Sequence, residues 1–173
     1  MNRPLLHFYA ETSPDANGRW LSDILAWSNT RLERQHDYIQ WLFPLAEPSN
    51  VVPDAPLVDA NVSAAFRREP LLRANLLKAL RRMLQFYGLH CDDEDPAEIW
   101  IEKSDEYADR QCVWLTRGNH NYRRLTRILR CLTILGCAPY AIAFLDCLER
   151  IYRERGGVIG TTTLANWRSA CGR

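Results

Sequence analysis

Apolar residues recur along the chain with the spacing of α-helices, and the strict alternation of half-buried strands is almost absent. The clearest case is segment 70–87, which begins with Pro70, a residue favoured at the first helical position, and stops at Gly88, a residue favoured just after the last. One face of this segment holds Leu72, Leu76, Leu80, Met83 and Tyr87. The pattern predicts an all-α fold: a single-domain, irregular bundle of about seven or eight helices over residues 1–173.

Capping residues, prolines and glycines divide the rest of the chain into shorter elements. Helices are predicted at 19–27, 30–43, 60–68, 104–115, 119–135, 139–155 and 164–170. Four prolines make 44–58 a non-helical connection, and the acidic stretch 91–103 is predicted to be a loop.

The helix predicted at 30–43 contains the densest group of chemically capable side chains, in the stretch RLERQHDYIQWLFP. Helical spacing makes it apolar on two sides, which is typical of a helix buried between neighbours, and turns His36 inward. A narrow polar stripe at its edge consists of Glu33, Asp37 and Gln40. His36 and Asp37 point about 100° apart on a helix, so they cannot form a catalytic dyad with each other. The simplest interpretation of His36 is a core histidine.

A second dense motif is RGNHNYRRLTRILRCL at 117–132. Asn119 is a good helix cap, His120 points away from the core, and Asn121 lies at the centre of the apolar face. A buried asparagine without hydrogen bonds costs about 1–3 kcal/mol, so Asn121 is expected either to fix a loop or to form the floor of a site. The side opposite the core carries Arg123, Arg127 and Arg130.

The net charge of +1 predicts no strong attraction to nucleic acid or anionic lipid. The charges are uneven, because segments 61–88 and 117–130 are basic while 90–110 holds nine acidic residues against Lys103 and Arg110. We expect the acidic segment to neutralise the basic ones, so nucleic acid is not expected as a partner. The alternative is a phosphate or nucleic-acid binder through the Arg117–Arg130 helix, with an anion site at Arg123, Arg127 and Arg130.

The six cysteines form no C-x-x-C pair and no common zinc spacing, so we expect reduced thiols, no metal site and no cofactor. The longest apolar stretch, 131–145, is interrupted by Gly136 and Pro139 and is shorter than the roughly 20 residues of a membrane span. The N-terminal segment lacks the apolar region of a signal peptide. These features lead us to expect a soluble, cytoplasmic protein.

Taken together, the two dense motifs resemble the conserved region of the opioid growth factor receptor family. The specific elements are HDYIQWLFP at 36–44 and NHN followed by RLTRIL at 119–129. Their surroundings are similar as well, namely FY at 8–9, LSDILAW at 21–27, LE at 32–33, AP at 55–56, RMLQFYG at 82–88 and Trp-x-x-Ala at 167–170. The resemblance extends over almost the whole chain.

The resemblance implies a non-enzymatic binding or interaction module with a peptide or protein partner, because the eukaryotic member is a receptor for the peptide Met-enkephalin. That member is associated with the nuclear envelope, so a nuclear or membrane-associated location is the alternative to the cytoplasm. It also carries a long additional C-terminal region, and a chain that ends at Arg173 is therefore expected to be a free-standing, prokaryotic-type member.

Two hypotheses about the site remain open. In the first, the His36 helix meets the segment 119–121, as a structural polar knot or as the floor of a ligand groove. This candidate ligand site consists of His36, Asp37, Gln40, Trp41, Asn119, His120 and Asn121. In the second, residues 33–41 and 119–121 form the polar site of a small enzyme. Because the sequence has no G-x-S-x-G, P-loop, G-x-G-x-x-G or H-E-x-x-H motif, we assign no catalytic residue and prefer the binding hypothesis.

Overall fold

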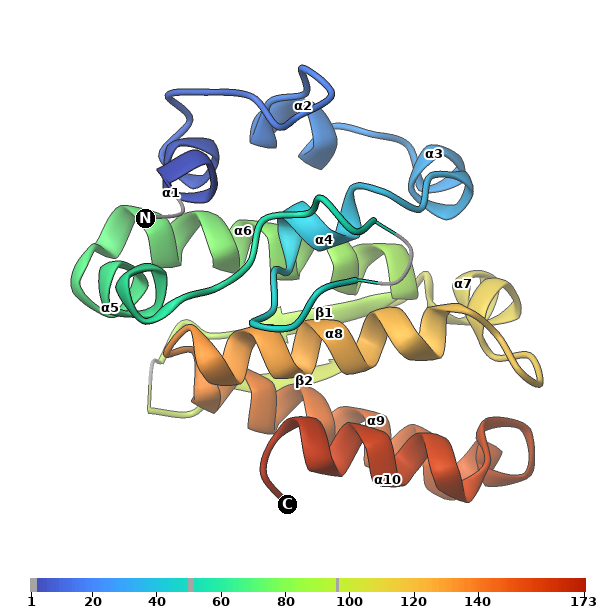
Figure 1. Cartoon of the computed structure of the whole chain (residues 1–173). Helices are drawn as coiled ribbons and strands as arrows, with labels where there is room; N and C mark the ends of the chain where they lie inside the picture. The colour runs from blue at the N-terminus through green and yellow to red at the C-terminus, as the bar shows by residue number, and fades with distance from the viewer. Residues whose placement is uncertain (1–2, 50–51, 96) are drawn as a thin grey trace. The chain divides into compact units, whose positions relative to one another are not determined.

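The chain is mostly helical and also contains one small sheet (Figure 1). The structure, a computed structural model, describes residues 3–49, 52–95 and 97–173, and these ranges hold ten helices and two strands. The prediction of a helical protein is confirmed, but seven or eight helices was too few and the absence of a sheet was wrong. Contacts group the chain into two compact units, Met1–Arg82 with Ile134–Gly136 (unit 1) and Met83–Thr133 with Cys137–Arg173 (unit 2). The single-domain interpretation stays a prediction.

Unit 1 contains five short helices and most of a long one. They are α1 (Arg3–Tyr9), α2 (Leu21–Leu25), α3 (Asn29–Arg34), α4 (Ile39–Leu42), α5 (Ala60–Arg68) and α6 (Pro70–Tyr87), which ends in unit 2. Aromatic side chains hold α1 in this unit: Phe8 contacts Trp41 and Tyr9 contacts Phe66 with ring centroids 5.3 and 4.9 Å apart. The Asn75 amide also donates to the Tyr9 carbonyl at 2.7 Å. Buried rings and one buried hydrogen bond therefore fix α1 on the neighbouring helices.

Two predicted helices of this unit match the structure closely. Helix α5 begins after Asp59, whose carboxylate accepts from the Val62 N–H at 2.8 Å as an N-cap. Helix α6 begins at Pro70, and every residue of its predicted core stripe is buried. Helix α1 was not predicted, because its segment is short and lacks a recognisable cap.

The helix predicted at 30–43 is wrong, because the chain leaves the helical path after Arg34 and resumes it at Ile39. In a continuous helix the Leu32 carbonyl would accept from the backbone N–H four residues later. Here it accepts instead from the Tyr38 hydroxyl at 3.1 Å, and the Tyr38 ring is fully buried against Trp27. Burial of Tyr38 thus competes with helix continuation and leaves 35–38 as a turn.

After the end of α6, unit 2 contains a β-hairpin where a loop was predicted. Strand β1 (Leu89–Asp92) pairs antiparallel with β2 (Trp100–Lys103), so that Leu89 lies opposite Lys103. Burial alternates along β1, with Leu89 and Cys91 inside and their neighbours exposed, and Ile101 is buried on β2. The strands have only four residues each and the segment between them is acidic, so the alternation was not recognised in the sequence.

The other elements of unit 2 are α7 (Tyr107–Trp114), α8 (Asn121–Ile134), α9 (Ala138–Ile159) and α10 (Thr161–Ala170). Two tryptophans hold them together: the Trp114 indole donates to the Tyr87 carbonyl at 3.1 Å and the Trp167 indole to the Tyr122 carbonyl at 3.2 Å. Helix α9 continues past the predicted stop at 156–157, with a local kink at Arg155, and gives way to α10 at Gly160. All six cysteines are thiols rather than disulfides. Within the described ranges, each helix is too short or too polar to cross a bilayer.

Candidate functional site

His36 and Asp37 belong to unit 1 and lie in the turn between α3 and α4. His36 is exposed, so the prediction of a core histidine is wrong; the helix break turns it outward. Both carboxylate oxygens of Asp37 accept from the Arg19 guanidinium, at 3.0 and 3.1 Å, and one also accepts from the Asn17 amide at 2.9 Å. Asp37 therefore joins this turn to the loop before α2.

A second carboxylate completes an ion cluster around Arg19. Asp15 is 5% exposed, and it accepts from the Arg19 Nε at 2.6 Å and from the backbone N–H groups of Asn17 and Arg19. Burial alone would lower the pKa of Arg19, but the hydrogen bonds and charges of Asp37 and Asp15 outweigh it and raise this pKa above its ordinary value. Each carboxylate oxygen of Asp15 and Asp37 already accepts a hydrogen bond, so these two side chains serve to position the loop.

Gln40 and Trp41, on α4, are both buried rather than at an edge. Gln40 is 4% exposed; its amide nitrogen donates to the Ser49 hydroxyl at 3.4 Å, and its Oε1 has no hydrogen-bond donor among the described residues. Trp41 is 6% exposed and packs edge-on against Phe8. The expected position of Gln40 at the edge of the helix is therefore wrong, and Trp41 lies in the core of unit 1.

Asn119, His120 and Asn121 belong to unit 2 and surround the start of α8. The Asn119 side-chain oxygen accepts from the backbone N–H and the side-chain amide of Asn121, at 2.9 and 3.1 Å. Its amide nitrogen donates to the Val113 carbonyl at 3.0 Å, and the Asn121 oxygen accepts from Arg124 at 3.2 Å. The cap at Asn119, the inward position of fully buried Asn121 and the outward position of His120 are confirmed.

The seven residues of the candidate ligand site thus divide between the two units. Within unit 1, Asp37 belongs to the Arg19 cluster; within unit 2, Asn119 and Asn121 bond to each other. A joint site of the His36 segment with 119–121 stays a prediction, and so does ligand binding by these residues.

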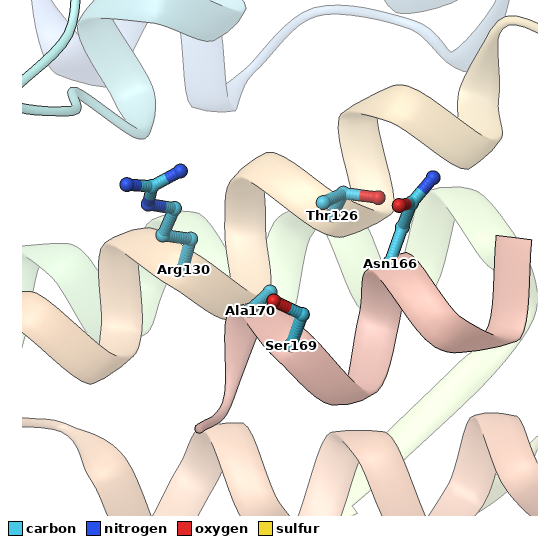
Figure 2. A pocket seen from close by; sticks show the side chains of 5 residues that line it. All are labelled: Thr126, Arg130, Asn166, Ser169 and Ala170. Carbon is cyan, nitrogen blue, oxygen red and sulfur yellow. The ribbon is translucent and has the colours of Figure 1, made fainter. Parts of the chain in front are cut away.

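Unit 2 contains a polar hollow of about 300 Å³ between α8 and α10 (Figure 2). Its lining consists of Thr126, Arg130, Asn166, Ser169 and Ala170. Figure 2 shows the Arg130 guanidinium on one side, and on the other the Thr126 hydroxyl pointing towards the Asn166 side chain. Arg130 was in the predicted arginine stripe, but the other lining residues were missed. Thr126 lies one turn before Arg130 on the same face of α8, and Asn166 and Ser169 share a face of α10. The sequence shows these two faces, but it does not show that α8 and α10 pack beside each other.

A second hollow in unit 2, also about 300 Å³, is mainly apolar. It is lined by Ala97, Ile99, Pro139, Ile142, Ala143 and Asp146. Ile142 is 38% exposed, and Trp100, next in the chain to Ile99, is 49% exposed. The Arg150 guanidinium lies 4.1 Å from the centroid of the Trp100 ring. Because Ile142, Asp146 and Arg150 follow one another at four-residue spacing, the hollow and Trp100 lie along one face of α9.

Several thiol and phenol groups of unit 2 have raised pKa values. Burial raises the pKa of the Cys147 thiol to about 11 and that of the Cys171 thiol to about 11, whereas a reactive thiolate requires a lowered pKa. Burial, with a smaller contribution from the Glu154 charge, raises the pKa of Tyr107 to about 12. In the part of the chain that the structure describes, no three histidine, cysteine or acidic side chains gather in a way that could hold a metal ion.

The family model and the individual relatives that match the chain all belong to one family. The family described as the opioid growth factor receptor (OGFr) conserved region matches residues 2–155. The chain is 36% identical over 139 residues to the opioid growth factor receptor of Rattus norvegicus. These aligned residues are 78% of this chain and 23% of the rat protein. It is 34% identical over 163 residues to the opioid growth factor receptor of Homo sapiens (90% of this chain, 23% of that protein).

A further relative is the opioid growth factor receptor-like protein 1 of Mus musculus, 32% identical over 135 residues, which cover 76% of this chain and 28% of that protein. The chain thus spans about a quarter of the length of the curated relatives it matches. No solved structure matches the chain.

Proposed function

The chain belongs to the opioid growth factor receptor family through its conserved region, and from this premise we propose that this receptor-like domain binds a short peptide and catalyses no reaction. The names of its relatives describe receptors for a growth factor. The chain matches about a quarter of those proteins, so the peptide ligand is our assignment for the conserved region alone.

The apolar hollow on α9 is the observation that carries this proposal. It offers aliphatic side chains from both sides, and the exposed Ile142 and Trp100 leave apolar surface next to it. Tryptophan is enriched among the residues that dominate binding energy, and Arg150 holds this one in place through its guanidinium. Asp146, at the edge of the hollow, is paired with Arg173 at 2.9 Å. An apolar hollow beside an exposed tryptophan is suited to a short peptide with an apolar side chain.

The chemistry of the side chains supports binding rather than catalysis. An enzyme built from residues 33–41 and 119–121 needs an available base or nucleophile, yet Asp37 is bound to Arg19, and Asn119 and Asn121 bond to each other. The buried thiols have raised pKa values. A family of receptors does not by itself exclude an enzyme, so our preference for binding depends on these occupied groups.

A phosphate or nucleic-acid binder is the second candidate, and one observation favours it: α8 carries four arginines and no acidic residue. Two arginines of this region serve the fold, however. Arg124 is 5% exposed and bonds to Asn121, and Arg117 donates to the Gly157 carbonyl at 3.4 Å. This candidate is therefore weaker than peptide binding.

A calorimetric titration with Met-enkephalin and a short random-sequence peptide library tests the proposal. We expect at least one peptide to bind, and Trp100→Ala to weaken it by about tenfold, because exposed tryptophans at interfaces contribute strongly. Leu71→Ala is the matched control, since Leu71 is 57% exposed and is not among the residues that line the hollow. Absence of binding by every peptide, or equal effects of the two substitutions, would contradict the proposal.

A further inference from the structure

The apolar hollow on α9 lies beside the acidic segment that connects the two strands of the hairpin. The Tyr140 hydroxyl donates to the Asp93 carboxylate at 2.8 Å, and Tyr140 follows Pro139, which lines the hollow. Further along the same segment, Ala97 and Ile99 line the hollow themselves. The connecting segment is therefore attached to the hollow at both ends. The acidic residues that lie between these points, which we call the acidic rim, are Glu94, Asp95 and Glu98.

The acidic rim is exposed and has no counter-ion among the described residues. One Asp95 carboxylate oxygen accepts from the Ala97 N–H at 2.9 Å, which places this charge directly at the lining of the hollow. The side chains of Glu94 and Glu98 make no hydrogen bond or ion pair with any residue in the described ranges. Three carboxylates close together in sequence repel one another, and a cation bound between them relieves that repulsion.

The cations that lie near the hollow in unit 2 are engaged with other groups. Arg173 pairs with Asp146 at 2.9 Å, and Lys103 pairs with Glu154 at 2.6 Å. The Arg150 guanidinium lies over the ring of the hairpin tryptophan, 4.1 Å from its centroid. The single charge of Arg150 cannot neutralise three carboxylates, so the surface beside the hollow stays negative.

The hollow itself selects an apolar group, so a cation alone does not complete the match. Its lining is mainly aliphatic, and Ile142 and Trp100 are 38% and 49% exposed. Covering these side chains removes apolar surface from water, which favours an apolar side chain in the hollow. The ligand that complements both features carries an apolar side chain next to a cationic one.

We propose that the occupant of the hollow on α9 is a basic peptide, with an apolar side chain in the hollow and a neighbouring lysine or arginine on the acidic rim. This inference rests on the proposed function, because it assigns the chemistry of the peptide to the same site. An extended peptide advances about 3.3 Å per residue, so a long cationic side chain next to the apolar one reaches the rim. The relevant rim carboxylates are exposed, which gives a charge preference rather than a buried ion pair.

Nuclear magnetic resonance of the isotopically labelled full chain tests the charge preference with three blocked tripeptides. They are N-acetylated and C-amidated Lys-Leu-Lys, Gln-Leu-Gln and Glu-Leu-Glu, which share the apolar residue and differ in charge. We expect Lys-Leu-Lys to shift the backbone signals of Ile99, Ile142 and Ala143 saturably. At low salt it should bind about tenfold more tightly than Gln-Leu-Gln, and Glu-Leu-Glu more weakly than either. Lys-Gly-Lys, which lacks the apolar side chain, should give no saturable shift.

Removal of two rim charges tests the location of the preference. Glu94→Gln combined with Glu98→Gln is expected to reduce the advantage of Lys-Leu-Lys over Gln-Leu-Gln to about threefold or less. Asp105→Asn combined with Glu106→Gln is the matched control, because both residues are exposed and neither lines the hollow. This control removes the same charge and should keep the advantage within about twofold, since charges beyond about 8 Å are screened at physiological salt. Circular dichroism checks that both double variants keep the helical fold.

Failure of this inference is distinguishable from failure of the proposed function. Equal binding of Lys-Leu-Lys and Gln-Leu-Gln at the hollow would overturn the basic peptide but leave a peptide-binding domain. Equal losses in the two double variants would overturn the acidic rim as the cation site. Binding of Lys-Gly-Lys as tight as that of Lys-Leu-Lys would overturn the apolar half of the assignment. If no tripeptide and no library peptide binds, the peptide-receptor function itself is wrong.

Discussion

Among the side chains that the sequence marks as chemically capable, the prediction of burial is right for some and wrong for others. Asn121 was predicted to be buried because it lies on the apolar face of a strongly periodic helix, and it is fully buried. His36 was predicted to be buried by the same reasoning and is exposed, because the hydroxyl of Tyr38 takes a carbonyl that the helix needs. Periodicity therefore predicts a residue's burial only where the helix continues, and a competing side-chain hydrogen bond is not visible in the pattern.

Tyr107 allows a prediction at the same scale. Its hydroxyl is buried without a hydrogen-bond partner among the described residues, and burial with the Glu154 charge raises its pKa from 10.0 to about 12. Between these pH values the unfolded chain loses the proton and the folded chain keeps it, so stability present below pH 10 falls as pH rises through 12. Tyr107→Phe should remove the loss of folding stability that the ionisation of Tyr107 causes above pH 10.

Urea unfolding of the wild type and Tyr107→Phe at a series of pH values measures the effect. We expect the two to differ little near neutral pH, since the substitution removes no hydrogen bond to any residue in the described ranges, and the variant to become relatively more stable above pH 10. The buried cysteines titrate in both proteins and cancel in the comparison. A constant difference across the series would show that Tyr107 does not ionise in this way.

At the scale of elements, helices with strong caps were predictable and the hairpin was not. Asp59 and Pro70 marked the starts of α5 and α6 correctly, because both residues act locally. The strands β1 and β2 have four residues each, and β2 packs against α9, which lies far along the chain. The polar hollow was missed for the same reason: its two halves come from α8 and α10, and their pairing is a property of the folded unit.

Gly88 joins α6 to the hairpin and gives the element-scale prediction. Its φ is +75°, and a Cβ there would lie 2.7 Å from the Tyr107 α-carbon, so Gly88→Ala adds both backbone strain and a backbone clash. We expect a loss of about 2–4 kcal/mol in the free energy of unfolding. Gly118 is the matched control, because its φ is +70° but a Cβ added there would have no atom of the described residues within 4 Å.

Urea denaturation of both alanine variants separates the two contributions. Gly118→Ala carries the backbone strain alone and should lose only about 1 kcal/mol. Equal losses would mean that the contact with Tyr107 relaxes without cost and that the junction between α6 and the hairpin is not tightly packed.

At the scale of the whole molecule, the charge balance limits which partners the protein attracts over long distances. The net charge is +1, so the strong field that drives association with a polyanion is missing. The charge balance therefore does not favour a nucleic acid as partner, in agreement with our proposal of a short peptide.

This balance gives the last prediction: duplex DNA and single-stranded RNA should bind very weakly or not at all at about 150 mM salt. Arg124 is buried against Asn121 and Arg117 is bound to a backbone carbonyl, so the arginines of this region cannot all reach phosphates at once. A protein that neutralises several phosphates loses affinity steeply with salt, whereas contact through one arginine gives a shallow dependence. Fluorescence anisotropy with labelled oligonucleotides between low and physiological salt measures the slope. Tight binding with a steep slope would show that α8 presents a continuous basic surface and would make nucleic acid, rather than a peptide, the better candidate ligand.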